Sequence, residues 1–262
     1  MDLNLNGKNV LITGGSAGIG LACALAFATE GCKLHLAARD AKNLSAARER
    51  IVAAHPGVSV TCHTVDLSDS AQLRQLATAC GKIDILVNNA GAIPGGTIDV
   101  VDEAAWRAAW DLKVFGYINL LREVYRDMRE AGSGVIVNVI GMAGERPKAN
   151  YIAGSGGNAA LMAISRAIGA DGPDHGVRVL AVNPGLVATE RLEKIMRERA
   201  VATLKDESRW KEIYDDSVKS LPFRRAARPD EVANVVVFMA SDRASYVSGT
   251  VVTVDAGFNV MI

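Results

Sequence analysis

The amino-acid sequence predicts an α/β protein with one doubly wound domain, in which helices cover both faces of a seven-stranded parallel sheet. Short β-branched runs alternate with longer amphipathic segments from residue 8 to the end of the chain, a pattern typical of repeated β-α units with right-handed crossovers. Several short runs are apolar on both faces, as strands between two helical layers must be. A glycine-rich turn joins the first run to the first amphipathic segment, as in many doubly wound sheets.

The expected elements follow one another without a break in composition. Strands are expected over residues 9–13, 33–37, 58–65, 83–88, 135–139, 177–182 and 250–254, and helices over 18–30, 41–54, 69–80, 103–130, 155–170 and 230–240. No Pro-, Gly- or Ser-rich linker divides the chain, so residues 1–262 are expected to form a single domain. Residues from about 190 to 221 form a charged, helix-prone excursion with no strand partner, and we call this segment the lid because such excursions often cover binding sites.

The bulk composition excludes several classes of function. The 262 residues carry 29 basic and 29 acidic side chains, so the chain has no excess of positive charge for binding nucleic acid or an anionic membrane. Neither a secretory leader nor a membrane-spanning run is expected, which predicts a cytoplasmic location. The four cysteines and four histidines are dispersed without metal-ligand spacing, so we expect no metal site and no disulfide framework. Small-molecule ligands are the expected partners.

The glycine-rich turn has the spacing that a phosphate-binding loop needs. Gly14, Gly18 and Gly20 lie in TGGSAGIG, between the first strand and the first helix. Glycine permits the tight turn and the close approach of a pyrophosphate to the backbone, while the helix N-terminus offers unpaired N–H groups. The position of the turn between a strand and a helix makes this signal much stronger than a glycine triplet alone.

A series of motifs in order resembles the short-chain dehydrogenase/reductase family over nearly the whole chain. They are the glycine turn, Asp66 after the third strand, NNAG at 88–91, NPGLVAT at 183–189 and the segment 228–257. The resemblance implies a Rossmann fold and a nicotinamide cofactor, with Ser16 and Ile19 at the phosphates and nicotinamide. The further residues that it assigns to the cofactor are Gly14, Gly18, Gly20, Asp66, Leu67, Asn89, Ala90, Gly91, Pro184, Gly185, Val187 and Thr189.

The end of the second strand favours NADP over NAD. An acidic side chain at this point would bind the ribose 2′-hydroxyl of NAD and repel a 2′-phosphate. Ala38 stands where NAD-dependent members of the family carry that acid, and the Arg39 guanidinium that follows is suited to phosphate. NAD remains possible, because Asp40 is adjacent and the glycine turn has no basic residue.

The catalytic motif of the family is altered in this sequence. Members that reduce ketones typically use Asn, Ser, Tyr and Lys, in which a nearby cation lowers the phenol pKa so that the tyrosine can exchange a proton. Alignment of NVIGMAG (138–144) and the usual spacing place Gly141, Gly154 and Asn158 at the Ser, Tyr and Lys positions, and DLKVFG places Lys113 at the Asn position. All four positions differ from the family pattern.

Two interpretations of this change compete. In the first, the chain is a nucleotide-binding protein without hydride transfer, serving as a regulatory or partner subunit. In the second, the same residue types rebuild an atypical site for a carbonyl or secondary alcohol. Lys113 would then supply the cation near the ribose, Tyr151 the proton, and Ser155 or Asn158 the contact to the substrate oxygen. Tyr151 lies one helical turn before the usual position, and its phenol reaches the nicotinamide rim only if its loop folds inward.

The remaining expectations concern the substrate and self-association. Ile195, Met196, Leu204, Trp210 and Tyr214 give the lid an apolar side, which could line a pocket for a bulky apolar substrate or pack on its own domain. The C-terminal FNVMI is apolar enough to suggest a subunit contact. The family resemblance implies a homotetramer or a homodimer.

Overall fold

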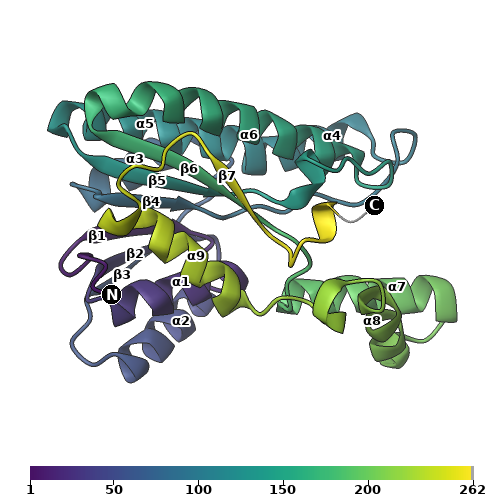
Figure 1. Cartoon of the computed structure of the whole chain (residues 1–262). Helices are drawn as coiled ribbons and strands as arrows, with labels where there is room; N and C mark the ends of the chain where they lie inside the picture. The colour runs from purple at the N-terminus through teal and green to yellow at the C-terminus, as the bar shows by residue number, and fades with distance from the viewer. Residues whose placement is uncertain (261–262) are drawn as a thin grey trace.

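Seven parallel strands form one sheet in the computed structural model, which describes residues 1–260 (Figure 1). The strand order is β3-β2-β1-β4-β5-β6-β7. The strands are β1 (Asn9–Thr13), β2 (Lys33–Ala38), β3 (Val60–Thr64), β4 (Ile85–Asn88), β5 (Gly134–Val139), β6 (Val177–Pro184) and β7 (Val251–Val254). The prediction of a single doubly wound α/β domain is confirmed.

Helices cover the sheet in two layers, one on each face (Figure 1). One layer holds α1 (Gly18–Thr29), α2 (Ala41–Ala54) and α9 (Pro229–Ala240), and its buried aliphatic side chains pack against those of β1 and β2. The other layer holds α3 (Ser70–Cys80), α4 (Glu103–Trp110), α5 (Gly116–Ala131) and α6 (Ile152–Asp171). Burial on both faces explains why the strand sequences are apolar throughout.

The strand order reverses beside β1, which pairs with β2 on one side and β4 on the other. In open parallel sheets a crevice forms at such a switch point, beyond the carboxyl ends of the strands. The turn after β1, the end of β4 and the end of β5 all reach this edge of the sheet, so the motifs found in the sequence converge there.

The long helix expected over residues 103–130 is interrupted. Between α4 and α5 the chain makes one π-helical turn, Asp111–Phe115, before α5 begins at Gly116. A Cβ at Gly116 would lie 2.8 Å from the Leu67 carbonyl oxygen, so α5 begins in close contact with the loop after β3. Lys113 lies within this π turn and is only 7% exposed. Such turns are frequent at functional sites.

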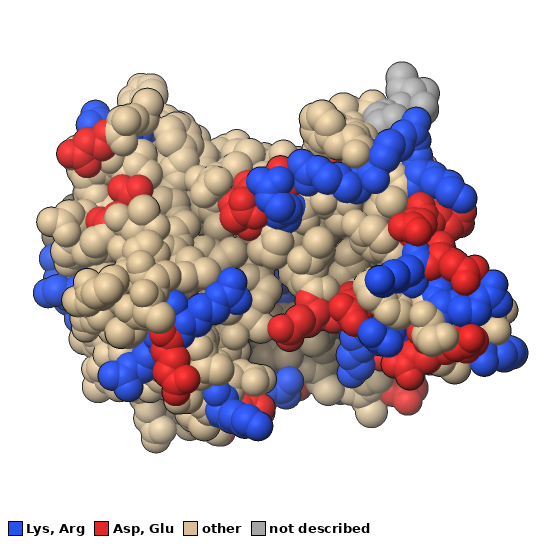
Figure 2. All heavy atoms as spheres, turned by 90° about the horizontal axis from the view of Figure 1, so that it is seen from below, with Lys and Arg blue, Asp and Glu red and all other residues tan. Residues whose placement is uncertain are grey.

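The lid lies outside both layers. It contains α7 (Glu190–Leu204) and α8 (Trp210–Val218), which project from the sheet between β6 and α9 (Figure 1). From below, Lys and Arg are interspersed with Asp and Glu over the side of the molecule where these helices lie (Figure 2). Within residues 1–260, no helix is long and apolar enough to cross a membrane. Met261 and Ile262 of the apolar C-terminus lie outside the described residues.

Candidate active site

The turn after β1 has the geometry of an anion-binding loop. Gly14 and Gly18 have φ angles of +65° and +54°, which side chains with a Cβ rarely adopt. A Cβ at Gly20 would overlap the Gly14 carbonyl oxygen. Ala17, the N-cap of α1, makes no side-chain hydrogen bond to the helix. The first N–H groups of α1 therefore lack the usual cap and suit a phosphate group.

Hydrogen bonds hold this turn against the end of β4. The Thr13 hydroxyl accepts hydrogen bonds from the backbone N–H groups of Asn89 (2.9 Å) and Ala90 (3.1 Å). In return the Asn89 side-chain amide donates to the Thr13 carbonyl at 3.0 Å. Because a Cβ at Gly18 would lie 3.3 Å from the Thr189 methyl group, the loop after β6 also meets the turn. The structure thus brings together three of the motifs that the family resemblance assigns to the cofactor.

The side chains at the ends of β2 and β3 lie near each other. The Ser68 backbone N–H (3.0 Å) and hydroxyl (2.7 Å) both donate hydrogen bonds to the Asp66 carboxylate and lower its pKa, and the charge of Arg39 acts in the same direction. Asp40 instead caps α2 by accepting a hydrogen bond from the Asn43 backbone at 2.8 Å. Within residues 1–260, Arg39 makes no salt bridge, so its charge is available to a ligand.

A cavity of about 1460 Å³ lies beyond the ends of β4, β5 and β6, between the sheet and α7. Tyr151, Asn158 and Pro184 border the cavity on the side of the domain, and Ile195 and Met196 border it on the side of the lid. Trp210 and Tyr214 pack instead against Leu192 and Met196 in a small cluster of the lid's own apolar side chains. The lid therefore contributes aliphatic side chains to the cavity, and its aromatic side chains stabilise the lid.

Tyr151 is held inward at the start of α6. It is the N-cap residue of α6, and its backbone pairs with Gly96 in the loop after β4 through hydrogen bonds on both sides of Tyr151. A Cβ at Gly154 would overlap the Tyr151 ring. The ring therefore lies over the surface of the helix where a side chain at position 154 would begin.

Arg191 is the cation that acts on the Tyr151 phenol, and the sequence analysis did not single it out. Its guanidinium donates to the backbone carbonyls of Gly91 (2.6 Å) and Ile93 (3.3 Å), so it reaches from α7 across to the loop after β4. Burial raises the pKa of Tyr151, and the Arg191 charge opposes that rise. The only signal in the sequence was proximity, because Arg191 comes two residues after Thr189, the N-cap of α7.

Lys113 points into the packed interior. Its ammonium group donates to the Tyr117 hydroxyl (3.1 Å) and to the carbonyls of Val139 (3.1 Å) and Ile140 (3.2 Å) at the end of β5. A Cβ at Gly91 would overlap the Lys113 side chain, so the NNAG loop packs directly on its aliphatic stem. Burial, together with the charge of Arg191, lowers the pKa of Lys113 to about 7.

Asn158 and Ser155 hold two different segments of backbone. The Asn158 amide donates to the Gly141 carbonyl at 3.2 Å, and the Gly141 N–H donates to the Asn183 side chain at 3.3 Å. Gly141 has a φ of +138°, which favours glycine at this turn after β5. The Ser155 hydroxyl accepts a hydrogen bond from the Lys148 N–H at 3.0 Å, which fixes the loop before α6.

The structure thus separates the four residues that the sequence analysis grouped as catalytic. Tyr151 and Asn158 border the cavity, together with Arg191. Lys113 and Ser155 are buried and hydrogen-bonded to backbone groups. Lys113 contacts Tyr117, as helical spacing predicts, and its ammonium group also binds the Val139 and Ile140 carbonyls at the end of β5.

Residues 8–200 match the family described as short chain dehydrogenase. The chain belongs to the short-chain dehydrogenase family. This short-chain dehydrogenase is 30% identical over 261 residues to the NADPH-dependent reductase BacG of Bacillus subtilis, covering 95% of this chain and 97% of that protein. It is 34% identical over 265 residues to the L-tagatose-forming galactitol 2-dehydrogenase of Cereibacter sphaeroides, covering 98% and 96% of the two chains.

The solved structures agree with this assignment. The crystal structure of L-sorbose reductase from Gluconobacter frateurii, complexed with NADPH and L-sorbose, superposes with a TM-score of 0.93 at 32% identity and covers 100% of both chains. Levodione reductase superposes with a TM-score of 0.92 at 29% identity, covering 98% of this chain and 99% of that one.

Proposed function

We propose that this short-chain dehydrogenase is an NADPH-dependent oxidoreductase that reduces a carbonyl group, or oxidises a secondary alcohol, at an atypical active site. Support for NADPH comes from the relatives that are named for it or contain it, and from Arg39 at the end of β2, whose guanidinium suits a 2′-phosphate. The cofactor supplies or accepts hydride when bound. In the proposed binding mode, Gly14, Gly18 and Gly20 give its pyrophosphate access to the N-terminus of α1.

The atypical site rests on one observation, the position of the Tyr151 ring over Gly154. We assign Gly141, Gly154, Asn158 and Lys113 to the positions at which the family pattern has Ser, Tyr, Lys and Asn. A glycine at 154 leaves open the space that the Tyr151 ring takes, so the phenol enters the proposed catalytic region from the preceding turn. In this proposal, the glycine at position 154 and the tyrosine at position 151 together move the phenol one helical turn toward the N-terminus of α6.

The roles proposed for the side chains at the cavity follow from their contacts. Tyr151 is the proposed proton donor, because its phenol borders the cavity and the charge of Arg191 opposes the rise in pKa that burial causes. Arg191 supplies the positive charge that stabilises phenolate when the proton leaves. Asn158 has a second amide N–H besides the one bound to Gly141, and this group holds the substrate oxygen.

Lys113 and Ser155 act on the backbone around this site. Lys113 ties together the ends of β4 and β5, since its stem packs on Gly91 and its ammonium group binds the carbonyls of residues 139 and 140. Ser155 fixes the loop that carries Tyr151. Both are positioning residues in this proposal, and Arg191 takes the cationic role first considered for Lys113.

The cavity suits a substrate larger than a simple ketone. Ile140, Met142, Leu186, Ile195 and Met196 give it apolar walls, while basic side chains including Lys148 and Arg191 border the same space. We propose a bulky substrate with an apolar body and polar groups at one end.

Self-association is proposed on the family resemblance and on exposed apolar side chains. Ile98, Val100 and Phe115 are exposed near the start of α4 and α5, where burial in a homodimer or homotetramer would remove them from water. Light scattering of the purified chain would test this, and a monomer at micromolar concentration would contradict it.

The decisive experiment compares Tyr151→Phe with the wild-type protein on a panel of ketones with NADPH. We expect the variant to bind NADPH normally and to lose roughly 100-fold or more in kcat, as for removal of a general acid. Tyr246→Phe is the matched control, because Tyr246 is fully exposed and distant from α6 in sequence. Retention of kcat within threefold would contradict the role of Tyr151. NADPH binding without turnover of any substrate would favour the alternative, a nucleotide-binding regulatory subunit.

The pH dependence of the rate of alcohol oxidation tests the role of Arg191. Arg191→Met should raise the pKa seen in the rate of alcohol oxidation, because the charge that opposes the effect of burial on Tyr151 is removed. Lys211→Met, on the exposed side of α8, is the control. An unchanged profile in Arg191→Met would mean that Arg191 only fastens the lid to the loop after β4.

A further inference from the structure

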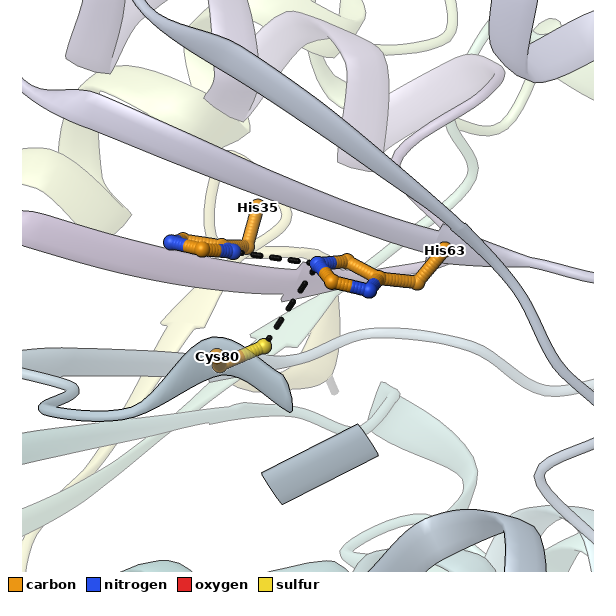
Figure 3. A group of neighbouring side chains, drawn as sticks. All are labelled: His35, His63 and Cys80. Atoms are coloured by element: carbon orange, nitrogen blue, oxygen red, sulfur yellow. Dashed lines mark hydrogen bonds between the residues drawn. The ribbon is translucent and has the colours of Figure 1, made fainter. Parts of the chain in front are cut away.

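Two strands and a helix bring a pair of imidazoles and a thiol together outside the cavity (Figure 3). His35 lies on β2, His63 on the neighbouring edge strand β3, and Cys80 at the end of α3. The strand register pairs His35 with Thr61 and Ala37 with His63, so the two imidazoles lie on the same face of the sheet, where α3 packs. Their separation in sequence is 28 residues, and Cys80 follows 17 residues after His63. Sequence spacing therefore gave no sign of this cluster.

The potential ligand atoms converge on a small volume. His35 Nδ1 lies 3.0 Å from His63 Nε2, which lies 3.7 Å from Cys80 Sγ. All three atoms lie within 4.8 Å of one another. In tetrahedral zinc sites, Zn–N bonds of about 2.0–2.1 Å and Zn–S bonds of about 2.3 Å place two nitrogens about 3.3 Å apart and N and S about 3.6 Å apart. The His35–His63 and His63–Cys80 separations match these values to within a few tenths of an ångström.

We propose that His35, His63 and Cys80 bind a zinc ion, with the fourth coordination position open to water or an exogenous ligand. Two imidazoles and one thiolate are a ligand set that zinc favours. Both histidines are half-buried beside the edge strand, which gives the ion a route from solvent, while Cys80 is buried. Zinc would join β2, β3 and α3 at one point.

The protonation states suit this role. Burial lowers the pKa of both imidazoles, and for His63 the neighbouring His35 adds to the effect, which favours the neutral form that binds a metal. Metal binding requires the tautomers in which His35 Nδ1 and His63 Nε2 carry no proton. Burial raises the pKa of the Cys80 thiol to about 12. Zinc binding therefore displaces the thiol proton, and each bound ion releases one proton to solvent.

Burial is the main cause of the pKa shifts of all three side chains, and no salt bridge between residues 1–260 involves His35, His63 or Cys80. A bound zinc with one thiolate carries a net charge of +1, which an anionic fourth ligand or water would screen.

The test uses the full-length protein, freed of metal with a chelator and titrated with Co²⁺ and then with Zn²⁺. We expect one equivalent of Co²⁺ to give intense tetrahedral d–d bands and a thiolate charge-transfer band, both abolished by one equivalent of Zn²⁺. Calorimetry of Zn²⁺ binding in buffers of different ionisation enthalpy should report the release of one proton. Weak octahedral cobalt bands without charge transfer would overturn the proposal, because they indicate ions on surface carboxylates.

Variants identify the ligands. Cys80→Ser and His63→Gln should each weaken Zn²⁺ binding roughly 100-fold, since one of three protein ligands is lost. Cys62→Ser is the matched control, because the Cys62 thiol contacts the Leu44 carbonyl on the other face of β3. Should Cys80→Ser fail to fold, His35→Gln tests the same site. Unchanged affinity in the folded ligand variants would overturn the assignment. None of these measurements depends on catalytic activity, so the result is independent of the proposed function.

Discussion

The cofactor region and the catalytic region lie at the same edge of the sheet, but they are encoded in different ways. At the turn after β1 the backbone itself forms the site, and glycines are required because a Cβ would overlap a carbonyl or force an unfavourable φ. At the start of α6 the chemistry depends on side chains, and their positions follow from packing with residues far away in sequence. A local motif can therefore specify the first region, whereas the function proposed for the second depends on side chains that no local motif specifies.

The largest expected effect lies in the cofactor region. Gly20→Ala would place a methyl group on the Gly14 carbonyl oxygen, and the turn must then move away from the N-terminus of α1. We expect NADPH affinity to fall by about 100-fold, a cost near 2.8 kcal/mol, measured by fluorescence titration. Gly156→Ala is the control, because its Cβ would meet only Trp110 at an ordinary 3.5 Å. An unchanged affinity would mean that NADPH does not bind at this turn.

The next effect tests whether the catalytic region depends on the space at position 154. Gly154→Ala would displace the Tyr151 ring, and we expect kcat to fall by about 30-fold with little change in NADPH binding, since a misplaced acid transfers a proton poorly. The same substitution two residues later, Gly156→Ala, should leave kcat unaltered. Equal effects of the two substitutions would indicate general destabilisation of α6.

A smaller effect is expected for cofactor preference. Arg39→Met removes the exposed guanidinium at the end of β2 and should raise the KM for NADPH by about tenfold without changing the KM for NADH, because a charge-assisted contact to the 2′-phosphate is worth about 1.4 kcal/mol. Lys42→Met, also exposed and at the start of α2, is the control. A parallel rise for both cofactors would contradict the assignment of Arg39 to the 2′-phosphate.

The smallest effect concerns Lys113 and the stability of the fold. Its pKa is lowered from 10.5 to about 7, so between these values the unfolded chain binds more protons than the folded chain and stability rises with pH. From pH 7 to pH 8 the gain is about 1 kcal/mol. This gain in stability with pH should be absent in Lys113→Met and present in Lys211→Met.

Urea denaturation at a pH of about 7 and of about 8 measures this difference. The comparison stays below pH 9, because burial raises the pKa of Cys23, Cys32 and Cys80 to about 12, and their titration in the unfolded chain reverses the trend. An equal gain with pH in wild type and Lys113→Met would show that Lys113 titrates normally.

The sequence determined the fold and the conformation of the glycine-rich turn after β1. Alternating apolar runs fixed the strands, because each strand is buried on both faces, and the spacing of Gly14, Gly18 and Gly20 specified the turn through backbone sterics alone. Most helix limits were close, apart from the expected helix 103–130, which a π turn divides, and α6, which begins at Ile152 and not near residue 155.

Only the tertiary structure decided which side chains meet. Arg191 and Tyr151 are brought together because the lid crosses to the loop after β4, and Lys113 meets the end of β5 because the helical layer and the sheet pack there. His35, His63 and Cys80 converge because parallel strand register and helix packing place distant residues on one face. Backbone conformation is a local property that sequence patterns carry, whereas contacts between side chains depend on how the completed layers pack.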